Sequence, residues 1–136
     1  MVEGLKRGKE GWNSLIRYLR LFQSFMYLNF DIKDNILIVN LRGELDHNSA
    51  EELRVKVDNM IDSSSIENII LNFSGVSFMD SSGIGAVIGR YKKIKLREGN
   101  LVVTNVSKNV SKIFEMSGLY KIIKKYDTVS EAAECM

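Results

Sequence analysis

The sequence contains no proline, one cysteine, one histidine and one tryptophan among its 136 residues. One cysteine, Cys135, cannot form a disulfide within the chain and suits a reducing compartment, so we expect a cytoplasmic protein. His47 and Cys135 alone are too few soft ligands to suggest a metal centre, and no motif indicates a cofactor. No apolar run would span a bilayer and no signal peptide is evident, so we expect no stable membrane association. Without proline, only glycine and serine mark the ends of helices.

The positive charge of the chain lies in its first 25 residues. They hold five basic and two acidic side chains out of totals of 19 and 17, which leaves 14 basic and 15 acidic side chains in the remainder. The remainder therefore carries a net charge of −1, and we expect no direct nucleic-acid binding by it. Its hydrophobic and charged contents are ordinary for one globular domain, which we expect to span residues 26–136.

Residues 1–25 also carry an apolar stripe. Five side chains recur at the spacing of one helical face: Trp12, Leu15, Ile16, Leu19 and Phe22. This N-terminal extension has three interpretations. It is a helix docked on the domain or on a second copy in a homodimer, a basic segment that touches a membrane, or an appended segment before the domain.

Beyond residue 25, predicted strands and helices alternate. Alternating and apolar runs predict strands at 27–33, 36–41, 66–73, 100–104 and 120–124. Helical spacing predicts helices at about 49–62, 82–96, 108–116 and 128–134. A loop at 43–48 would precede the first of these helices. Asn48 or Ser49 would cap that helix, and Glu51 and Glu52 would lie in its first turn. This order predicts an α/β fold with right-handed crossovers. It has a mostly parallel central sheet of four to five strands with an N-terminal hairpin, flanked by about four helices.

The turn between the third strand and the second helix is the most informative stretch. Residues 77–85 read Ser-Phe-Met-Asp-Ser-Ser-Gly-Ile-Gly. Short oxygen-bearing side chains such as that of Asp80 can accept hydrogen bonds from the unpaired amides that begin a helix, so a cap is expected here. A serine at a helix N-terminus is also a good place for a phosphate, because the free amides and the helix dipole stabilise negative charge.

The same turn does not match known catalytic loops. A nucleophile elbow requires Gly-x-Ser-x-Gly, whereas residues 79–83 read Met-Asp-Ser-Ser-Gly, and His47 is the only histidine available as a base. The following glycines miss the Gly-x-Gly-x-x-Gly spacing by one residue. Gly85 and Gly89 lie on one helical face, which predicts a close approach of the helix backbone to the sheet or to a partner. We therefore expect a protein that is not an enzyme.

Three stretches together resemble the anti-sigma factor antagonists, which are bacterial members of the STAS domain family. They are residues 77–85, Gly43-Glu44-Leu45-Asp46-His47 and Met116-Ser117-Gly118-Leu119, in family order and at family spacing. The similarity extends from about residue 26 to about residue 133, and the second and third stretches are similar to the members that act in sporulation. The resemblance implies the STAS fold.

The resemblance also implies a mechanism of partner switching. The unphosphorylated protein would bind an anti-sigma factor that is also a serine kinase, and so release a sporulation sigma factor. That kinase would phosphorylate Ser81, and a PP2C-type serine phosphatase would remove the phosphate. The residues expected to contact the partner are Gly43, Glu44, Leu45, Asp46, His47, Asp80, Ser82, Gly83 and Ile84. An alternative is a STAS scaffold or sensor domain within a larger signalling complex.

Some of these residues have alternative roles. Asp80 is expected to cap the helix, or else to orient the Ser81 hydroxyl in the kinase site. The resemblance implies that Asp46 and Glu44 face basic residues of the anti-sigma factor, but Asp46 is also suited to capping the next helix. Loops that follow neighbouring strands cluster at one edge of a sheet, so residues 43–47 are expected near Ser81. Gly118 is expected to end the helix before the last strand.

Overall fold

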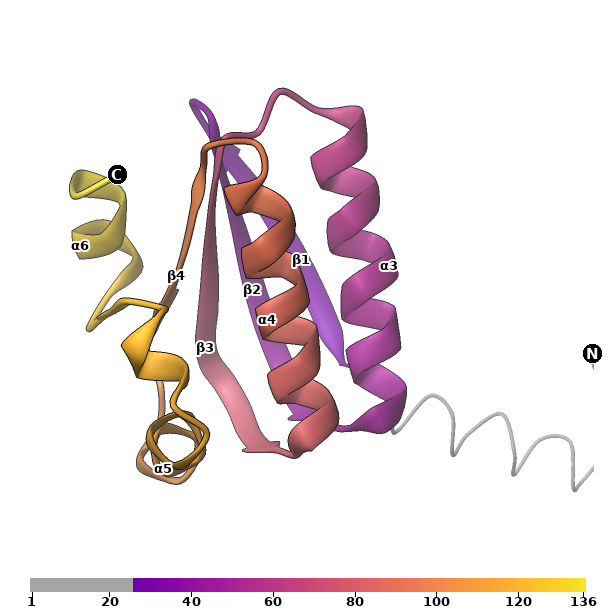
Figure 1. Cartoon of the computed structure of the whole chain (residues 1–136), viewed down its shortest axis with the longest axis vertical. Coiled ribbons are helices and arrows are strands. Elements are labelled where there is room, and N and C mark those ends of the chain that lie inside the picture. The colour runs from indigo at the N-terminus through magenta and orange to yellow at the C-terminus, as the bar shows by residue number, and fades with distance from the viewer. Residues whose placement is uncertain (1–25) are drawn as a thin grey trace, which may run out of the picture.

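Five strands form one sheet in the computed structural model, which describes residues 26–136 (Figure 1). They lie side by side in chain order: β1 (Tyr27–Lys33), β2 (Ile36–Leu45), β3 (Asn68–Met79), β4 (Asn100–Thr104) and β5 (Lys125–Tyr126). β1 pairs with β2 in antiparallel fashion, and all other neighbours are parallel. The predicted α/β fold with an N-terminal hairpin is confirmed. The apolar stripe predicted within residues 1–25 lies outside the described residues.

Helices cover both faces of this sheet. They are α3 (His47–Ser63), α4 (Ser81–Lys95), α5 (Lys108–Met116) and α6 (Val129–Glu134), with a short 3-10 helix η1 (Leu119–Lys121) after α5. α3 and α4 pack side by side on one face, and α6 lies on the other side of the sheet (Figure 1). None of the helices between residues 26 and 136 is both long and apolar enough to cross a membrane.

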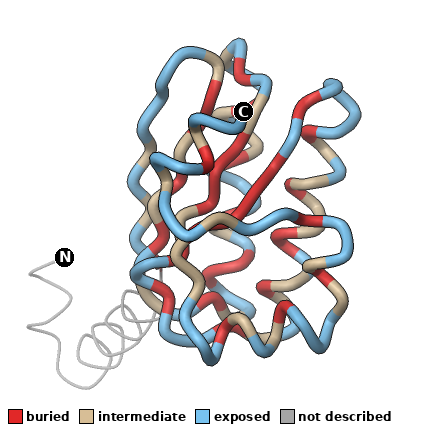
Figure 2. Tube along the Cα trace, turned by 90° about the vertical axis from the view of Figure 1, so that its left-hand side faces the viewer, coloured by how far each residue is buried: buried red, intermediate tan, exposed pale blue. Residues whose placement is uncertain are grey.

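Alternation of side chains along the central strands divides the core into two parts. On one face, residues such as Leu37 and Leu71 pack in the large cluster that α3, α4 and α5 complete. On the other face, Ile70 and Val102 meet Ala132 of α6. Because the central strands are covered on both sides, β3 is apolar at successive positions, as its sequence suggested. Figure 2 shows the buried residues gathered along the strands and the inner faces of the helices.

β2 and β3 both extend further towards their C-terminal ends than predicted. β2 continues to Leu45, and β3 begins at Asn68 and continues to Met79, where Glu44 lies opposite Phe78 and Leu45 opposite Met79. Ser74, Gly75 and Ser77 are residue types typical of a turn, but Val76 and Met79 are only 3% and 1% exposed and pack in the core, which keeps this stretch in the strand. Two register shifts between β2 and β3 accommodate this stretch.

The strand predicted at residues 120–124 is wrong. Leu119–Lys121 forms η1, and the last strand is the two-residue β5. Leu119 and Ile123 are each 1% exposed and lie four residues apart, which is the spacing of a helical turn, and the Ile123 N–H donates to the Leu119 carbonyl at 2.8 Å. Gly118 has a φ of 78°, in the left-handed region, and ends α5 as predicted.

Candidate partner-binding site

The two loops expected at the site lie together at the C-terminal ends of β2 and β3. The ends of these neighbouring parallel strands are in register, with Leu45 opposite Met79. The next residue, Asp80, donates its backbone N–H to the Leu45 carbonyl at 3.2 Å. The expectation that residues 43–47 lie near Ser81 is therefore confirmed.

Asp80 caps α4, as expected. Its Oδ1 atom accepts hydrogen bonds from the backbone N–H groups of Ser82 at 2.8 Å and of Gly83 at 3.3 Å. These are two of the amides that have no partner within the helix. Ser81 is consequently the first residue of α4, and it is exposed at the capped end of the helix.

Asp46 caps α3 in the same way, and the prediction that Asn48 or Ser49 is the cap is wrong. Asp46 Oδ1 accepts hydrogen bonds from the N–H groups of Asn48 and Ser49, both at 3.0 Å. Ser49 Oγ in turn accepts from the Asp46 N–H at 2.8 Å and donates to the Glu44 carbonyl at 2.6 Å. This capping box starts the helix at His47. The expected acidic pair at residues 51 and 52 therefore lies beyond the first turn.

Gly83 allows the start of α4 to lie directly against the end of β2. A Cβ atom at this position would lie 2.5 Å from Met79 Cγ, 2.8 Å from Leu45 Cγ and 2.9 Å from the Leu45 carbonyl oxygen. Leu45 itself is fully buried. Gly83 and Leu45, both expected site residues, are therefore buried beneath this edge of the sheet, whereas Glu44, His47 and Ser81 are exposed on it.

A groove of about 540 Å³ runs between α3 and α4 beside this edge. It is lined by His47, Asn48, Ala50, Glu51, Arg54, Ser82, Gly85, Ala86 and Arg90. The predicted close approach of Gly85 and Gly89 to the sheet is wrong, because a Cβ atom at either position would meet open space. Gly85 instead leaves this side of α4 without a side chain and widens the groove.

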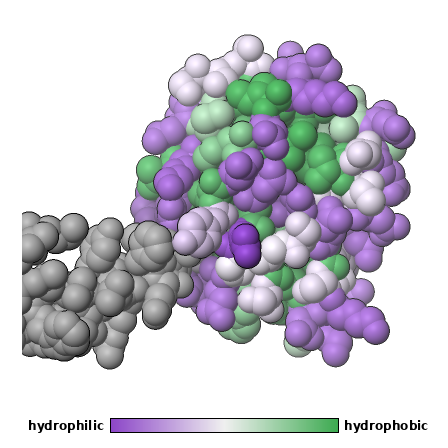
Figure 3. Space-filling model, turned by 180° about the vertical axis from the view of Figure 1, so that it is seen from behind, coloured by the Kyte–Doolittle hydropathy of each residue, from purple (hydrophilic) through white to green (hydrophobic). Residues whose placement is uncertain are grey.

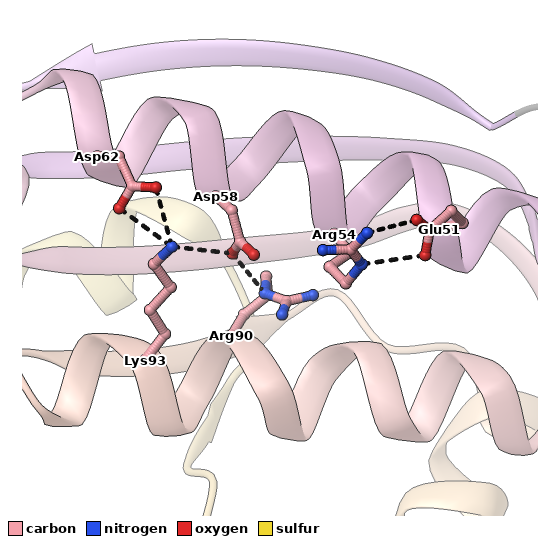
Figure 4. Close-up of polar contacts among 6 residues, drawn as sticks. All are labelled: Glu51, Arg54, Asp58, Asp62, Arg90 and Lys93. Carbon is pink, nitrogen blue, oxygen red and sulfur yellow. Dashed lines mark hydrogen bonds and ion pairs between the residues drawn. The ribbon is translucent and has the colours of Figure 1, made fainter.

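Ion pairs between α3 and α4 hold the walls of the groove together (Figure 4). Arg90 of α4, only 7% exposed, lies with its Nε atom 2.8 Å from Asp58 of α3, and Lys93 reaches Asp62 at 3.0 Å. Burial lowers the pKa of Arg90, and the neighbouring Asp58 carboxylate opposes that shift. This ion pair was not predicted from the sequence. The sequence feature that could have indicated it is the position of Arg90, which lies three residues after Val87 and four before Ile94, on the buried face of the helix.

Phe78 is a further residue that sequence reasoning did not assign to the site. It is 47% exposed on β3, next to Glu44 on β2, while the adjacent Met79 is buried. A half-exposed aromatic ring is typical of protein interfaces.

Comparison with known proteins places the chain in a family. A model of the STAS domain matches residues 27–132, and the chain belongs to the STAS domain family. It is 42% identical over 92 residues to the anti-sigma F factor antagonist of Paenibacillus polymyxa, covering 68% of this chain and 79% of that protein.

Two solved structures of a related antagonist resemble the fold. The anti-sigma factor antagonist SpoIIAA in its unphosphorylated form matches with a TM-score of 0.71 and 34% identity, over 79% of this chain and 94% of that chain. The Bacillus cell fate determinant SpoIIAA in its phosphorylated form matches with a TM-score of 0.64 and 33% identity, over 79% of this chain and 97% of that chain. The resemblance identified from the three stretches is confirmed.

Proposed function

We propose that this chain is an anti-sigma factor antagonist whose binding is switched by phosphorylation of Ser81. The unphosphorylated form binds an anti-sigma factor that is also a serine kinase, and thereby releases a sporulation sigma factor of the sigma-F type. A PP2C-type serine phosphatase returns the phosphorylated form to the binding state. The similarity to SpoIIAA, which has been solved with and without phosphate, supports this assignment.

The position of Ser81 carries the proposal. It is exposed and is the first residue of α4, so a kinase can reach its hydroxyl without unfolding the edge. A phosphate there would stand at an exposed position at the N-terminal end of the helix dipole, which favours an intact fold after phosphorylation. The Asp80 carboxylate is already engaged by two backbone N–H groups, so it is held in place as a cap and supports the turn that presents the serine.

The partner surface that we propose surrounds Ser81. Exposed Glu44 and His47 flank it from the β2 side, and Phe78 and Ile84 supply apolar contact area beside it. A phosphate adds a charge of about −1.5 to −2 within this surface. If accommodating that charge costs roughly 3–4 kcal/mol, the affinity for the partner falls by about two to three orders of magnitude.

The test uses the cognate kinase, ATP and the full chain. Phosphopeptide mapping should place the phosphate on Ser81 alone, and Ser81→Ala should abolish modification while it preserves binding to the kinase. Phosphate found on Ser82 or Ser77 would overturn the site assignment. A chain that binds no anti-sigma factor in either state would instead favour the role of a STAS scaffold in a larger signalling complex.

A further inference from the structure

The strand β1 forms one edge of the sheet, and within residues 26–136 no other strand pairs with its outer side. In an antiparallel pair, alternate residues turn their N–H and C=O groups away from the partner strand. Counted from the two-residue turn at Asp34 and Asn35, the residues whose backbone N–H and C=O groups point away from β2 are Leu28, Phe30 and Ile32. An edge of this kind is a template for pairing with another strand.

We propose that β1 pairs in antiparallel fashion with β1 of a second copy of this chain, about a two-fold axis at Phe30. This arrangement joins the two sheets into one. It sets Phe30 opposite Phe30, Leu28 opposite Ile32, and Asn29 opposite Asp31. Each of these pairs is of a favourable type: aromatic with aromatic, aliphatic with aliphatic, and amide donor with carboxylate acceptor.

The apolar pairs lie on the face of the sheet that α3 and α4 cover. Leu28 and Phe30 are partly buried against the main core, whereas Ile32 on the same side of β1 is 53% exposed. Pairing places Leu28 of the second copy over Ile32. The core of each copy then continues across the two-fold axis, and the exposed aliphatic side chain is removed from water.

The polar pairs lie on the opposite face, seen from behind in Figure 3, where hydrophilic and hydrophobic side chains are interspersed. Here Asn40 Nδ2 donates to Asn29 Oδ1 at 3.4 Å and to Asp31 Oδ2 at 3.1 Å. No hydrogen bond among the described residues uses Asn29 Nδ2 or Asp31 Oδ1. Asn29 Nδ2 can therefore donate to Asp31 Oδ1 of the second copy. Because of the two-fold axis, this hydrogen bond forms twice.

Charged residues on an edge strand normally discourage pairing between edges. In this register the Asp31 carboxylate faces the Asn29 amide, so the charge selects the register. A pairing shifted to centre on Asp31 would set two carboxylates face to face, which is unfavourable. The surface is also distinct from the partner-binding edge, because Ser81 follows β3, two strands away. The inference therefore stands independently of the proposed function.

Sedimentation velocity of the full chain from micromolar to millimolar concentration tests the pairing. Asn29→Lys creates two Lys–Asp31 pairs across the axis and should strengthen the dimer about tenfold, whereas Asn29→Asp opposes like charges and should weaken it about tenfold. Ile32→Lys should abolish the dimer. Val55→Lys on α3, at a position 41% exposed, is the matched control and should leave it unchanged. Circular dichroism verifies that each variant is folded.

Hydrogen exchange identifies the surface involved. The amides of Leu28, Phe30 and Ile32 should gain protection as the concentration rises and the dimer forms. A chain that stays monomeric at millimolar concentration overturns the proposal. Equal loss of the dimer in Ile32→Lys and Val55→Lys also overturns it, because the contact then lies elsewhere. Protection of these amides in the monomer at every concentration overturns it as well, because the chain's own residues then cover the edge.

Discussion

The backbone N–H of Asp80 donates to the carbonyl of Leu45 at 3.2 Å, and this bond joins the start of α4 to the end of β2. Asp46, which follows Leu45, caps α3, and Asp80 caps α4. The two capped turns are therefore connected through this backbone hydrogen bond and through the packing of Gly83 against Leu45. We expect a change in either turn to affect the structure of the other.

Asp46→Ala should lower the free energy of unfolding by about 0.5–2 kcal/mol, because it removes a cap that satisfies two amides. The sequence left capping open beside a contact with basic residues of the anti-sigma factor, and the structure shows the cap. Asp46→Asn separates the two roles, since asparagine caps about as well but carries no charge. It should retain stability in urea denaturation and, if a charge pair forms, associate with the kinase more slowly in a salt-dependent way. An Asp46→Ala protein as stable as the parent would contradict the capping role.

Gly83→Ala should destabilise the fold by about 1–3 kcal/mol, because its Cβ would overlap Met79 and the Leu45 backbone. Gly85→Ala is the matched control on the same helix. Its Cβ meets open space, so alanine should stabilise α4 by up to about 1 kcal/mol through helix propensity. Thermal unfolding of both variants gives the comparison. The same sign of effect at both positions would show that the packing at Gly83 is misassigned.

Asp58→Ala should lower the free energy of unfolding by roughly 1–3 kcal/mol, because it leaves the buried Arg90 guanidinium without its carboxylate. Asp62→Ala, whose side chain is 65% exposed and pairs with Lys93, should cost less than about 1 kcal/mol. Adding Arg90→Met to Asp58→Ala should recover part of the loss, since no unpaired charge is then buried. A double-mutant cycle by urea denaturation measures the coupling, and additive effects would refute it.

Ser81→Glu should weaken binding to the anti-sigma factor by about two orders of magnitude through its added charge, with little change in the melting temperature. Ser130→Glu introduces the same charge at an exposed position on α6 and should leave affinity unchanged. Titration calorimetry and thermal unfolding provide the two measurements. Equal weakening by both variants would point to a general charge effect.

A chain that starts at Met26 should fold and bind the kinase, because the core described here is assembled from residues 26–136. Met26 itself is 2% exposed, so the cut should not be made later in the sequence. We expect removal of residues 1–25 to lower stability only modestly. Circular dichroism and a kinase-binding titration would check this, and loss of binding would assign residues 1–25 to the functional surface.

The sequence predicted the alternating strands and helices and the place of Ser81 at the start of a helix, because both follow from local patterns. Apolar alternation marks the strands, and a short polar side chain such as that of Asp80 marks the start of a helix. The helical turn at Leu119 was missed because the apolar residues of so short a segment fit the spacing of a helix and that of a strand equally well, and only tertiary packing decides between them. The Asp58–Arg90 pair was missed because its members lie on different helices, whose pairing no sequence spacing encodes.

Glycines illustrate the same limit. The sequence shows that Gly83, Gly85 and Gly89 lie on one helix, but not which of them faces a neighbour. The predicted close approach of Gly85 and Gly89 to the sheet was wrong, because the face of α4 that meets the sheet is fixed only by the rotation at which the helix packs. Gly83 proved to be the position in contact with β2.

The carboxylate caps of α3 and α4 have an electrostatic consequence. Each helix N-terminus carries roughly half a positive charge, and here each is already offset by an aspartate, at Asp46 and Asp80. Glu44 adds a third carboxylate to this edge. Phosphorylation of Ser81 would therefore deepen an existing negative potential instead of reversing a positive one. A partner that recognises the edge must tolerate moderate negative charge and discriminate by its amount, so the switch should depend strongly on ionic strength.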